Sequence, residues 1–533
     1  MVWNTEHLEW TVTEFSKIVF QNYNKLKIAN KNKIVALILL VYSFLMTYLH
    51  SFNSVRFGDA AIYSDNAVFY LIGKALLKGQ VLYKDIFDHK TPYVYFINAF
   101  AALFDKNHLG LFVITSLVLF VSLYFTYKIV NLIINDKIYS LVSAALICLF
   151  LNNANMTLGF LRTEGYVVAL VLPSAYLFIR FLLDDKDSFD LSEMFIIGLL
   201  AGLTLMINLK AAILYVPFAF AVASVLKRHK NFKNIAQCFA FGLLGVVITI
   251  IPFIAYLLAT KSVKEAFDAI TYVNAIYSSN NSSIIALDET RVETVLTVFQ
   301  IHPIIAAVII VSLISIIVYR IQANIRIPVL LSYILCLLYT IFLNRPYTYY
   351  YTVVIPFIIP FCLIVYDLLY KKIKANAKKN LVAILLVIAF FIINIPIGYS
   401  VIGRRYNKNL AVKNTLEEML APHIKIDENT KVLSYGFGPE YYIYLNSNLA
   451  FKYFIIPNIK FDYYSEPYLK QIQYVKEALP DVLIFNFGNY TVQLPSKDFN
   501  EFKDAVTEHY QYLGKLNTSE EDVRSANVLI KKK

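Results

Sequence analysis

The sequence is poor in cysteine, glycine, tryptophan and charge. It has 4 cysteines, 16 glycines and 2 tryptophans among 533 residues, and only 16% of its residues are charged. The cysteines all lie in or at the edge of apolar segments, so the sequence predicts no disulfide framework. The low glycine content argues against the glycine-rich packing of many channels. Glycine-rich phosphate loops, nucleophile elbows and H-E-x-x-H motifs are absent, so nucleotide-sugar enzymes, hydrolases and metalloproteases lack support.

Hydrophobic residues, by contrast, are abundant. They make up 58% of the chain, which includes 40 tyrosines and 40 phenylalanines, and the mean hydropathy is +0.56. This composition predicts a polytopic α-helical membrane protein. The net charge is +12, but no basic helix or aromatic RNA-binding signature accompanies it. We therefore attribute the positive charge to cytoplasmic loops and expect no nucleic-acid partner.

Eleven apolar segments are long enough to cross a bilayer as helices, which takes about 17 to 25 residues. They lie near residues 34–50, 108–134, 138–156, 166–183, 193–209, 211–226, 235–259, 301–319, 326–343, 350–370 and 381–399. A further segment, TPYVYFINAFAALF at 91–104, has only 14 residues and carries a proline near its start. We expect this segment to lie along the outer interface of the membrane.

The distribution of basic residues supports this topology. Four basic clusters occur, namely NKLKIANKNK (24–33), KRHKNFK (227–233), RIQANIR (320–326) and KKIKANAKK (371–379). With eleven spans and a cytoplasmic N-terminus, all four face the cytoplasm, as the positive-inside rule requires. Counting 91–104 as a span would move the last three clusters outside. The sequence therefore predicts a cytoplasmic segment 1–33, a membrane domain 34–399 and a first external loop 51–107.

The chain changes character after residue 400. Three short runs are typical of strands, namely KVLSYG (431–436), DVLIFNF (481–487) and NVLIKK (527–532). Helix-like stretches such as 468–479 separate them. We therefore predict a small α/β domain over residues 400–533, on the outer side of the membrane.

The first external loop concentrates ionisable residues. They are Asp59, Asp65, Asp85, Asp88, His89 and Lys90. Ionisable groups near a membrane are costly unless they meet water or partners, so they are functional candidates. For a single acid such as Asp59 or Asp85, simple solvation is the plainer explanation. His89 beside two aspartates also makes a divalent metal possible, but D-x-x-D-H is a weak ligand pattern and we assign no metal.

The order of residues in this loop resembles that of a known family. Asp65 precedes an aromatic amphipathic helix, then G-x-x-x-Y, and then D-H-K-T-P at 88–92. This order resembles the first external loop of the C-type (GT-C) glycosyltransferases, the polyprenyl-phosphate-sugar enzymes that include the protein mannosyltransferases and the lipid A aminoarabinose transferase. The family commonly pairs the first acid with a second one where this chain has Asn66, and it more often has Pro or Gly in place of Thr91.

Four later segments continue the resemblance. They are LRTEGYVVALVLPSAY (161–176), GLTLMINLKAAILYVPFAF (202–220), LNRPYTYYYTVVIPFIIP (343–360) and KVLSYGFGPEYYIYLN (431–446). Glu164 corresponds to the acid of the family's second external loop, and Lys210 to a lysine at the outer end of paired helices. Arg345 corresponds to an arginine before a proline-punctuated span. The last segment resembles the opening strand of an external domain that some bacterial members carry.

The residue types in these segments suit sugar transfer from a lipid phosphate. A carboxylate can take the proton of the acceptor hydroxyl, and cations can stabilise the departing phosphate. We predict Asp65 as the general base, and the resemblance implies that Glu164 orients the acceptor or shares this role. The predicted substrate-binding residues are Asp59, Lys90, Arg162, Lys210, Arg345 and Tyr350. The plainer alternatives are snorkelling for Lys210, interface anchoring for Arg345 and an aromatic belt for the tyrosines at 349–351.

The leading hypothesis is an inverting membrane glycosyltransferase with a polyprenyl-phosphate donor such as undecaprenyl-phosphate sugar. Its acceptor is a hydroxyl of a lipid, glycan or protein at the outer face of the cell (inner or plasma) membrane. A lipid-linked saccharide transporter is one alternative, which predicts charges at mid-bilayer depth and broken helices. A non-catalytic envelope assembly protein is another. We expect acceptor specificity to lie in the 260–300 loop and the C-terminal domain.

Overall fold

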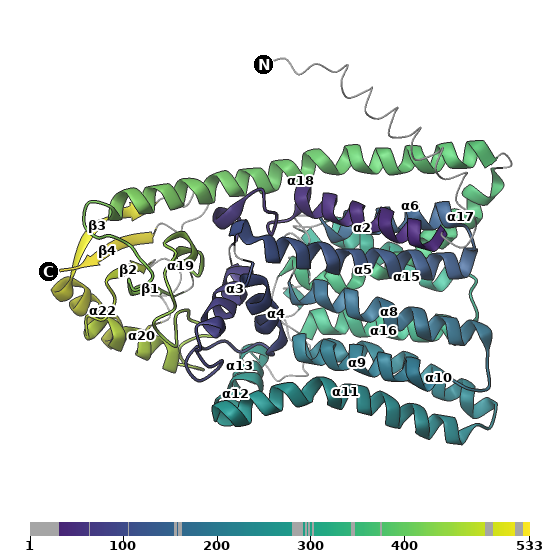
Figure 1. Ribbon diagram of the computed structural model, residues 1–533, viewed down its shortest axis with the longest axis horizontal. Coiled ribbons are helices and arrows are strands. Elements are labelled where there is room, and N and C mark those ends of the chain that lie inside the picture. Colours follow the sequence, from purple (N-terminus) through teal and green to yellow (C-terminus); the bar gives the residue numbers. More distant parts are fainter. Residues whose placement is uncertain are drawn as a thin grey trace, which may run out of the picture.

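A computed structural model shows a bundle of long helices with a small α/β domain at one end (Figure 1). The residues that it describes are 31–62, 64–104, 106–153, 157, 162–279, 292–293, 296, 299–300, 303–342, 347–373, 376–436, 438–485, 494–516 and 526–532. Most of the predicted cytoplasmic segment 1–33 therefore lies outside the described part of the chain.

The bundle helices overlap the predicted apolar segments, and the last helix continues well beyond the predicted end at residue 399. They are α2 (Lys31–His50), α5 (Leu109–Ile134), α6 (Lys137–Leu151), α8 (Thr163–Asp184), α9 (Leu191–Ile207), α10 (Val216–Arg228), α11 (Phe232–Thr260), α15 (Pro303–Val318), α16 (Ala323–Phe342), α17 (Ile359–Leu368) and α18 (Asn376–Leu420). Short 3-10 helices precede two of them, η4 (Leu209–Tyr215) before α10 and η6 (Thr348–Ile358) before α17. Apolar side chains on the facing sides of these helices form one large core.

Seven helical segments of the described chain are long and apolar enough to cross a membrane. The apolar helices α6, α9 and α15 are shorter than these seven. The structure thus confirms a polytopic helical membrane protein, while the count of eleven crossings stays a prediction. Helix α18 runs past residue 400 to Leu420, so that a single helix joins the bundle to the C-terminal domain (Figure 1).

Glycine has a local role that its low overall content did not suggest. A Cβ atom at Gly198 in α9 would lie 2.1 Å from the carbonyl oxygen of Gly242 in α11, and one at Gly245 would lie 2.5 Å from that of Phe195. Small residues let the backbones of membrane helices approach closely. The few glycines of the chain are therefore used where α9 and α11 pack together.

The first external loop folds into short helices across the end of the bundle. They are η2 (Gly58–Ala61), α3 (Ser64–Leu77) and α4 (Tyr93–Ala102). Helices α3 and α4 lie between the bundle and the C-terminal domain (Figure 1). A helix of 10 residues such as α4 is about 15 Å long, about half the hydrocarbon thickness of a bilayer. This length agrees with the prediction that residues 91–104 do not cross the membrane, which stays a prediction.

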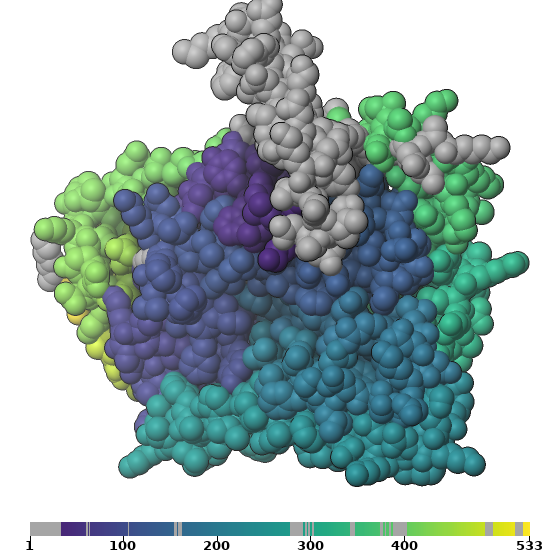
Figure 2. All heavy atoms as spheres, turned by 45° about the vertical axis from the view of Figure 1, so that its right-hand side comes forward, coloured from purple at the N-terminus to yellow at the C-terminus, as the bar shows by residue number. Residues whose placement is uncertain are grey.

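Residues from two separate loops contact the C-terminal end of α8. Arg228 pairs with Asp185 at the C-terminal end of α8 at 3.2 Å, and Asn324 donates a hydrogen bond to the Leu182 carbonyl at 2.9 Å. Two of the predicted cytoplasmic clusters therefore meet at this end of α8. The N-terminal end of α8 lies at the opposite end, where the C-terminal domain is docked. The space-filling view in Figure 2 shows the bundle from the first of these ends.

The C-terminal domain is a four-stranded sheet with helices. Its strands are β1 (Val432–Tyr435), β2 (Val482–Phe485), β3 (Tyr510–Leu516) and β4 (Ala526–Lys531), in the order β1-β2-β4-β3. Its helices are α19 (Glu440–Tyr444), α20 (Glu466–Lys476) and α22 (Ser496–His509). Strands β1 and β2 are parallel, and the other pairs are antiparallel. The three predicted strands and the predicted helix are confirmed, whereas β3 was not predicted because only its two end residues, Tyr510 and Leu516, are buried and it has no apolar run.

Candidate active site

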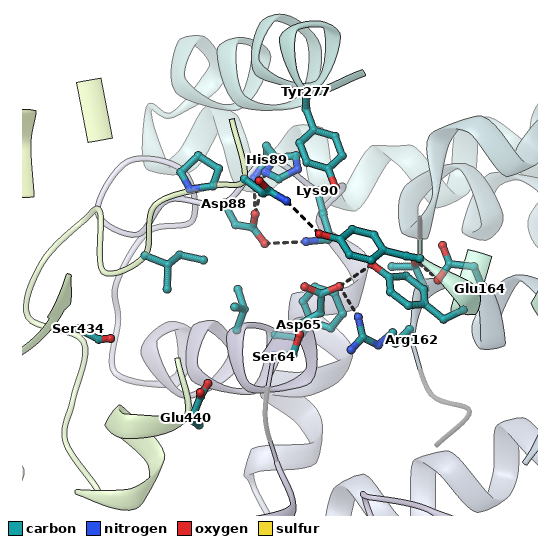
Figure 3. A pocket seen from close by; sticks show the side chains of 18 of the residues that line it. Ser64, Asp65, Asp88, His89, Lys90, Arg162, Glu164, Tyr277, Ser434 and Glu440 are labelled. Carbon is teal, nitrogen blue, oxygen red and sulfur yellow. Dashed lines mark hydrogen bonds and ion pairs between the residues drawn. The ribbon is translucent and has the colours of Figure 1, made fainter. Parts of the chain in front are cut away.

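A cavity of about 750 Å³ lies between the N-terminal end of α8, the first external loop and the C-terminal domain. Its walls come from segments far apart in the sequence: α3, the loop at 88–91, the start of α8, η4, η6, α18 and β1. Figure 3 shows charged side chains from these segments turned toward one another. A volume of this size is typical of small-molecule sites.

Asp65 is held in the cavity by an arginine and a tyrosine. The Arg162 guanidinium donates to Asp65 Oδ2 at 2.7 Å, and the Tyr349 hydroxyl donates to the same oxygen at 3.2 Å. Arg162 also lies over the Tyr349 ring, 4.1 Å from its centroid. The three side chains therefore form one contiguous group (Figure 3). Because Asp65 stands in the first turn of α3, the helix dipole also favours its charged form.

Lys90 lies close to the Asp88 carboxylate and to the Phe69 ring. Its Nζ is 3.6 Å from Asp88 Oδ2 and 5.1 Å from the centre of the Phe69 ring. Asp88 is buried and accepts hydrogen bonds from the Tyr95 hydroxyl and the His89 backbone N–H, both at 2.7 Å. These partners fix the loop that carries Lys90 at the rim of the cavity.

The pKa values of these groups follow from burial and charge together. Burial alone raises the pKa of Asp65, but Lys90 and Arg162 lower it by more, so that the pKa of Asp65 lies below its ordinary value. Burial lowers the pKa of Lys90, whereas Asp88 and Asp65 raise it above its ordinary value. Both groups are therefore charged at neutral pH.

Glu164 forms a separate polar group on the same cavity. It is buried in the first turn of α8, where its carboxylate accepts hydrogen bonds from the Tyr339 hydroxyl at 3.2 Å and from Thr163 at 3.0 Å. The Asn208 side chain donates to Tyr339 at 2.8 Å and lies 3.5 Å from Glu164 Oε1. Tyr339 and Asn208 thereby fix the orientation of this carboxylate.

Most of the predicted site residues come together. Six of them line the cavity: Asp65, Lys90, Arg162, Glu164, Lys210 and Tyr350. Lys210 reaches it from η4 and is exposed, while Tyr350 packs against Tyr349 with ring centres 4.7 Å apart. Arg345 lies outside the described residues. Asp59 lies in the described part of the first loop but does not line the cavity.

Asp59 instead joins the first loop to α18. His108 Nε2 lies 2.7 Å from Asp59 Oδ1, and Lys413 donates to Asp59 Oδ2 at 3.2 Å. The His108 hydrogen bond lowers the pKa of Asp59 most, burial opposes it, and the charges of His108 and Lys413 add to it, giving a value of about 2. This position favours a role in holding the site together rather than direct contact with substrate.

The Asp59→Asn variant tests this role through the pH dependence of stability. A carboxyl whose pKa is lower in the folded state adds stability above its unfolded pKa and loses it as pH falls through the folded value. We expect the variant to unfold about 1–2 °C below wild type at pH 6, since the pair is partly exposed. The difference should shrink between pH 4 and pH 2, as measured by scanning fluorimetry. An unchanged difference across that range would contradict the ion pair.

Several lining residues were not predicted from sequence. They are Asn208, Tyr277, Tyr339, Arg405, Lys408, Asn409, Ser434 and Glu440. The Tyr277 ring packs at a tilt against His89, with ring centres 4.8 Å apart, and its hydroxyl lies 3.5 Å from that of Tyr350. Each is a common polar or aromatic residue in an unremarkable local sequence. Three of them had a signal in the sequence: Asn208 lies two residues before the predicted Lys210, and Ser434 and Glu440 lie in the segment 431–446 that resembles the family.

The residues at 85–89 that suggested a metal site do not come together as ligands in the structure. The Asp88 carboxylate is occupied by Tyr95, His89 and Lys90, and Asp85 is exposed and accepts a hydrogen bond from the Val81 N–H. Among the described residues, no group of three His, Cys, Asp or Glu side chains could hold a metal ion. The residues at 85–89 therefore do not fit a metal site.

Comparison with known proteins agrees with this architecture. Residues 88–265 match the family model described as dolichyl-phosphate-mannose-protein mannosyltransferase. The fold is similar to ArnT from Cupriavidus metallidurans bound to undecaprenyl phosphate, with 12% identity, a TM-score of 0.55, and coverage of 94% of this chain and 98% of that one. The apo form of the same protein matches with 10% identity, a TM-score of 0.55, and coverage of 93% and 97%. No curated protein sequence matches the chain.

The chain therefore has the fold of the membrane glycosyltransferases of the GT-C class. Within that class, residues 88–265 resemble the protein mannosyltransferases. The matched region includes Lys90, Arg162, Glu164 and Lys210, whereas Asp65 and the C-terminal domain lie outside it.

Proposed function

We propose that the protein transfers a sugar from a polyprenyl phosphate, such as undecaprenyl phosphate, to an acceptor hydroxyl at the outer face of the membrane. The observation that carries this proposal is the Asp65, Arg162 and Lys90 group, which combines a charged carboxylate with two cations on one cavity. A base and a phosphate-binding group are the two functions that such a transfer needs.

Asp65 is the proposed general base. The acceptor oxygen attacks the anomeric carbon while Asp65 takes the hydroxyl proton, and the bond from that carbon to the phosphate oxygen breaks. The phosphate leaves with the electron pair, so the configuration at the anomeric carbon inverts. Without substrate, Lys90 and Arg162 hold the pKa of Asp65 low. A bound phosphate offsets those charges, which raises the basicity of Asp65 when the donor is in place.

Lys90, Arg162 and Lys210 are the proposed partners of the donor phosphate. As the phosphate leaves, its negative charge grows, so cations fixed beside it stabilise the transition state more than the ground state. Lys90 is held by Asp88, and Arg162 by Asp65 and the Tyr349 ring. These positions are therefore set before substrate binds, which is what electrostatic catalysis requires.

Glu164 is proposed to orient the acceptor hydroxyl or to share the role of base. Its carboxylate lines the cavity but has its own partners, Tyr339 and Thr163. A fixed carboxylate of this kind accepts a hydrogen bond from the acceptor with little loss of freedom. Arg345 stays a candidate for phosphate binding.

One assay separates transfer from transport. Purified protein is incubated with radiolabelled undecaprenyl-phosphate sugars, and label on acceptors is compared with label taken into sealed vesicles. Transfer supports the glycosyltransferase, and vesicle uptake without transfer supports a lipid-linked saccharide transporter. The absence of both transfer and uptake supports an assembly protein. The polar side chains of the cavity gather at one end of the bundle, an arrangement that favours transfer over transport.

We also propose that the protein lies in the cell membrane with the C-terminal domain outside. A cysteine at Lys230, in the turn between α10 and α11, should react with a membrane-impermeant maleimide only after the cells are permeabilised. A cysteine at the exposed Lys470 of α20 should react in intact cells. The four native cysteines are buried, so we expect little background labelling by the maleimide. Labelling of the Lys230 position in intact cells would contradict the proposed orientation.

A further inference from the structure

The cavity has a second wall, built by α18 and the C-terminal domain. Polar and aromatic side chains line it, among them Asn409, Ser434, Tyr435, Glu440, Tyr441 and Asn458. Figure 3 shows Ser434 and Glu440 on the opposite side of the hollow from Arg162 and Glu164. The C-terminal domain therefore encloses the space into which Asp65 faces.

This wall is fixed to the rest of the molecule by contacts on several sides. The Phe87 N–H donates to the Lys452 carbonyl at 3.0 Å, and the Gln80 side chain donates to the Leu449 carbonyl at 2.8 Å. Asn458 donates to the Tyr347 hydroxyl at 2.9 Å. The Tyr347 ring stacks on Tyr349 at 5.5 Å, and Tyr349 is the partner of Asp65. The second wall is thus connected to the proposed base through Tyr347 and Tyr349.

We propose that the second wall is the acceptor subsite and that it takes a saccharide. This inference rests on the proposed function. Sugar hydroxyls donate to carboxylates such as Glu440 and accept from amides such as Asn409, while the apolar faces of sugar rings pack on aromatic side chains such as Tyr441. The proposed phosphate-binding residues Lys90 and Arg162 belong to the opposite wall. Donor phosphate and acceptor sugar are thereby assigned to different sides of one cavity.

Two cations of α18, Arg405 and Lys408, border the same wall. They suit an acceptor saccharide that carries a phosphate or carboxylate group. A cavity of about 750 Å³ has room for the donor sugar together with the terminal residues of an acceptor glycan.

The edge of the sheet argues against a peptide acceptor added as a strand. Strand β1 is at the edge of the sheet and borders the cavity through Ser434. The Ser434 N–H already donates to the Tyr442 hydroxyl at 3.0 Å, and the Gly436 carbonyl accepts from the Ile456 N–H at 2.7 Å. A peptide that paired with this edge would have to displace these bonds.

The test uses the full-length protein in nanodiscs with radiolabelled undecaprenyl-phosphate glucose, mannose and aminoarabinose. The acceptors are short chitin and dextran oligosaccharides with and without a phosphate group, a peptide rich in serine and threonine, and diacylglycerol vesicles. We expect label on an oligosaccharide. Glu440→Gln should raise the KM for that acceptor about 10- to 100-fold, the scale of one charge-assisted hydrogen bond, with little change in undecaprenyl phosphate binding.

The matched control is Glu477→Gln, an exposed glutamate of the same domain that accepts a hydrogen bond from Gln473. Equal KM values for Glu440→Gln and this control would overturn the assignment of the second wall as the acceptor subsite. Label on the peptide alone or on the lipid alone would overturn the proposal that the acceptor is a saccharide. The proposed function, sugar transfer, would still stand. Failure of the proposed function is distinct, because the protein would then neither bind undecaprenyl phosphate in native mass spectrometry nor transfer sugar to any acceptor.

Discussion

The Asp65→Asn variant is expected to transfer sugar at least about a hundredfold more slowly than wild type, while it still binds undecaprenyl phosphate. The amide keeps the size of the side chain and can accept a hydrogen bond from Arg162, but it cannot take a proton from the acceptor. A hundredfold or more is the usual contribution of a general base. The measurement is kcat with radiolabelled undecaprenyl-phosphate sugar at saturating acceptor.

The control for Asp65→Asn is Asp85→Asn. Asp85 belongs to the same loop, but it is exposed and does not line the cavity. We expect this variant to keep wild-type turnover. If Asp65→Asn also kept it, Asp65 would be excluded as the base, and Glu164→Gln would be the next variant to measure. Unfolding midpoints of both variants show whether a loss of activity reflects a loss of fold.

The Lys90→Gln variant is expected to lose about 100- to 1000-fold in kcat, the scale of one fixed group that stabilises developing charge. It should also change the pH profile. Lys90 lowers the pKa of Asp65, so its removal raises that pKa. The acidic limb of kcat/KM, which reports the free enzyme, should therefore move to higher pH in the variant.

Two further variants make the Lys90 result specific. Lys90→Arg keeps the positive charge and should recover part of the activity and the wild-type pH profile. Lys84→Gln removes an exposed lysine of the same loop and should change neither. A loss of activity in Lys90→Gln without any shift of the acidic limb would contradict the coupling between Lys90 and Asp65.

The sequence predicted the helices and the composition of the site because each depends on local patterns. Apolar runs locate the bundle helices, and the short strand-like runs at 431–436, 481–487 and 527–532 locate β1, β2 and β4. The order of acids, lysines and prolines in the loops was enough to select six residues that line one cavity. Strand β3 was missed because only its two end residues are buried, so that it has no apolar run.

The partners of these residues could not be predicted, because they come from distant parts of the chain. Arg162 reaches Asp65 across 97 residues and Tyr349 reaches it across 284, while Tyr339 reaches Glu164 across 175. No local pattern encodes such contacts. Asp59 illustrates the same limit, since its pairing with Lys413 spans 354 residues and gives it a structural position that its place in the acidic loop did not suggest.

The second wall has a consequence for biosynthesis. Strand β4 follows the other three strands in the chain and borders the same cavity as Asp65 through Ala526. Ribosomes release the chain from its N-terminus onward, so the first loop and the bundle are made long before β4. The wall of the cavity is therefore complete only after β4 has joined its sheet. A chain interrupted before β4 would lack part of the proposed acceptor subsite, although Asp65 and its partners would already have been made.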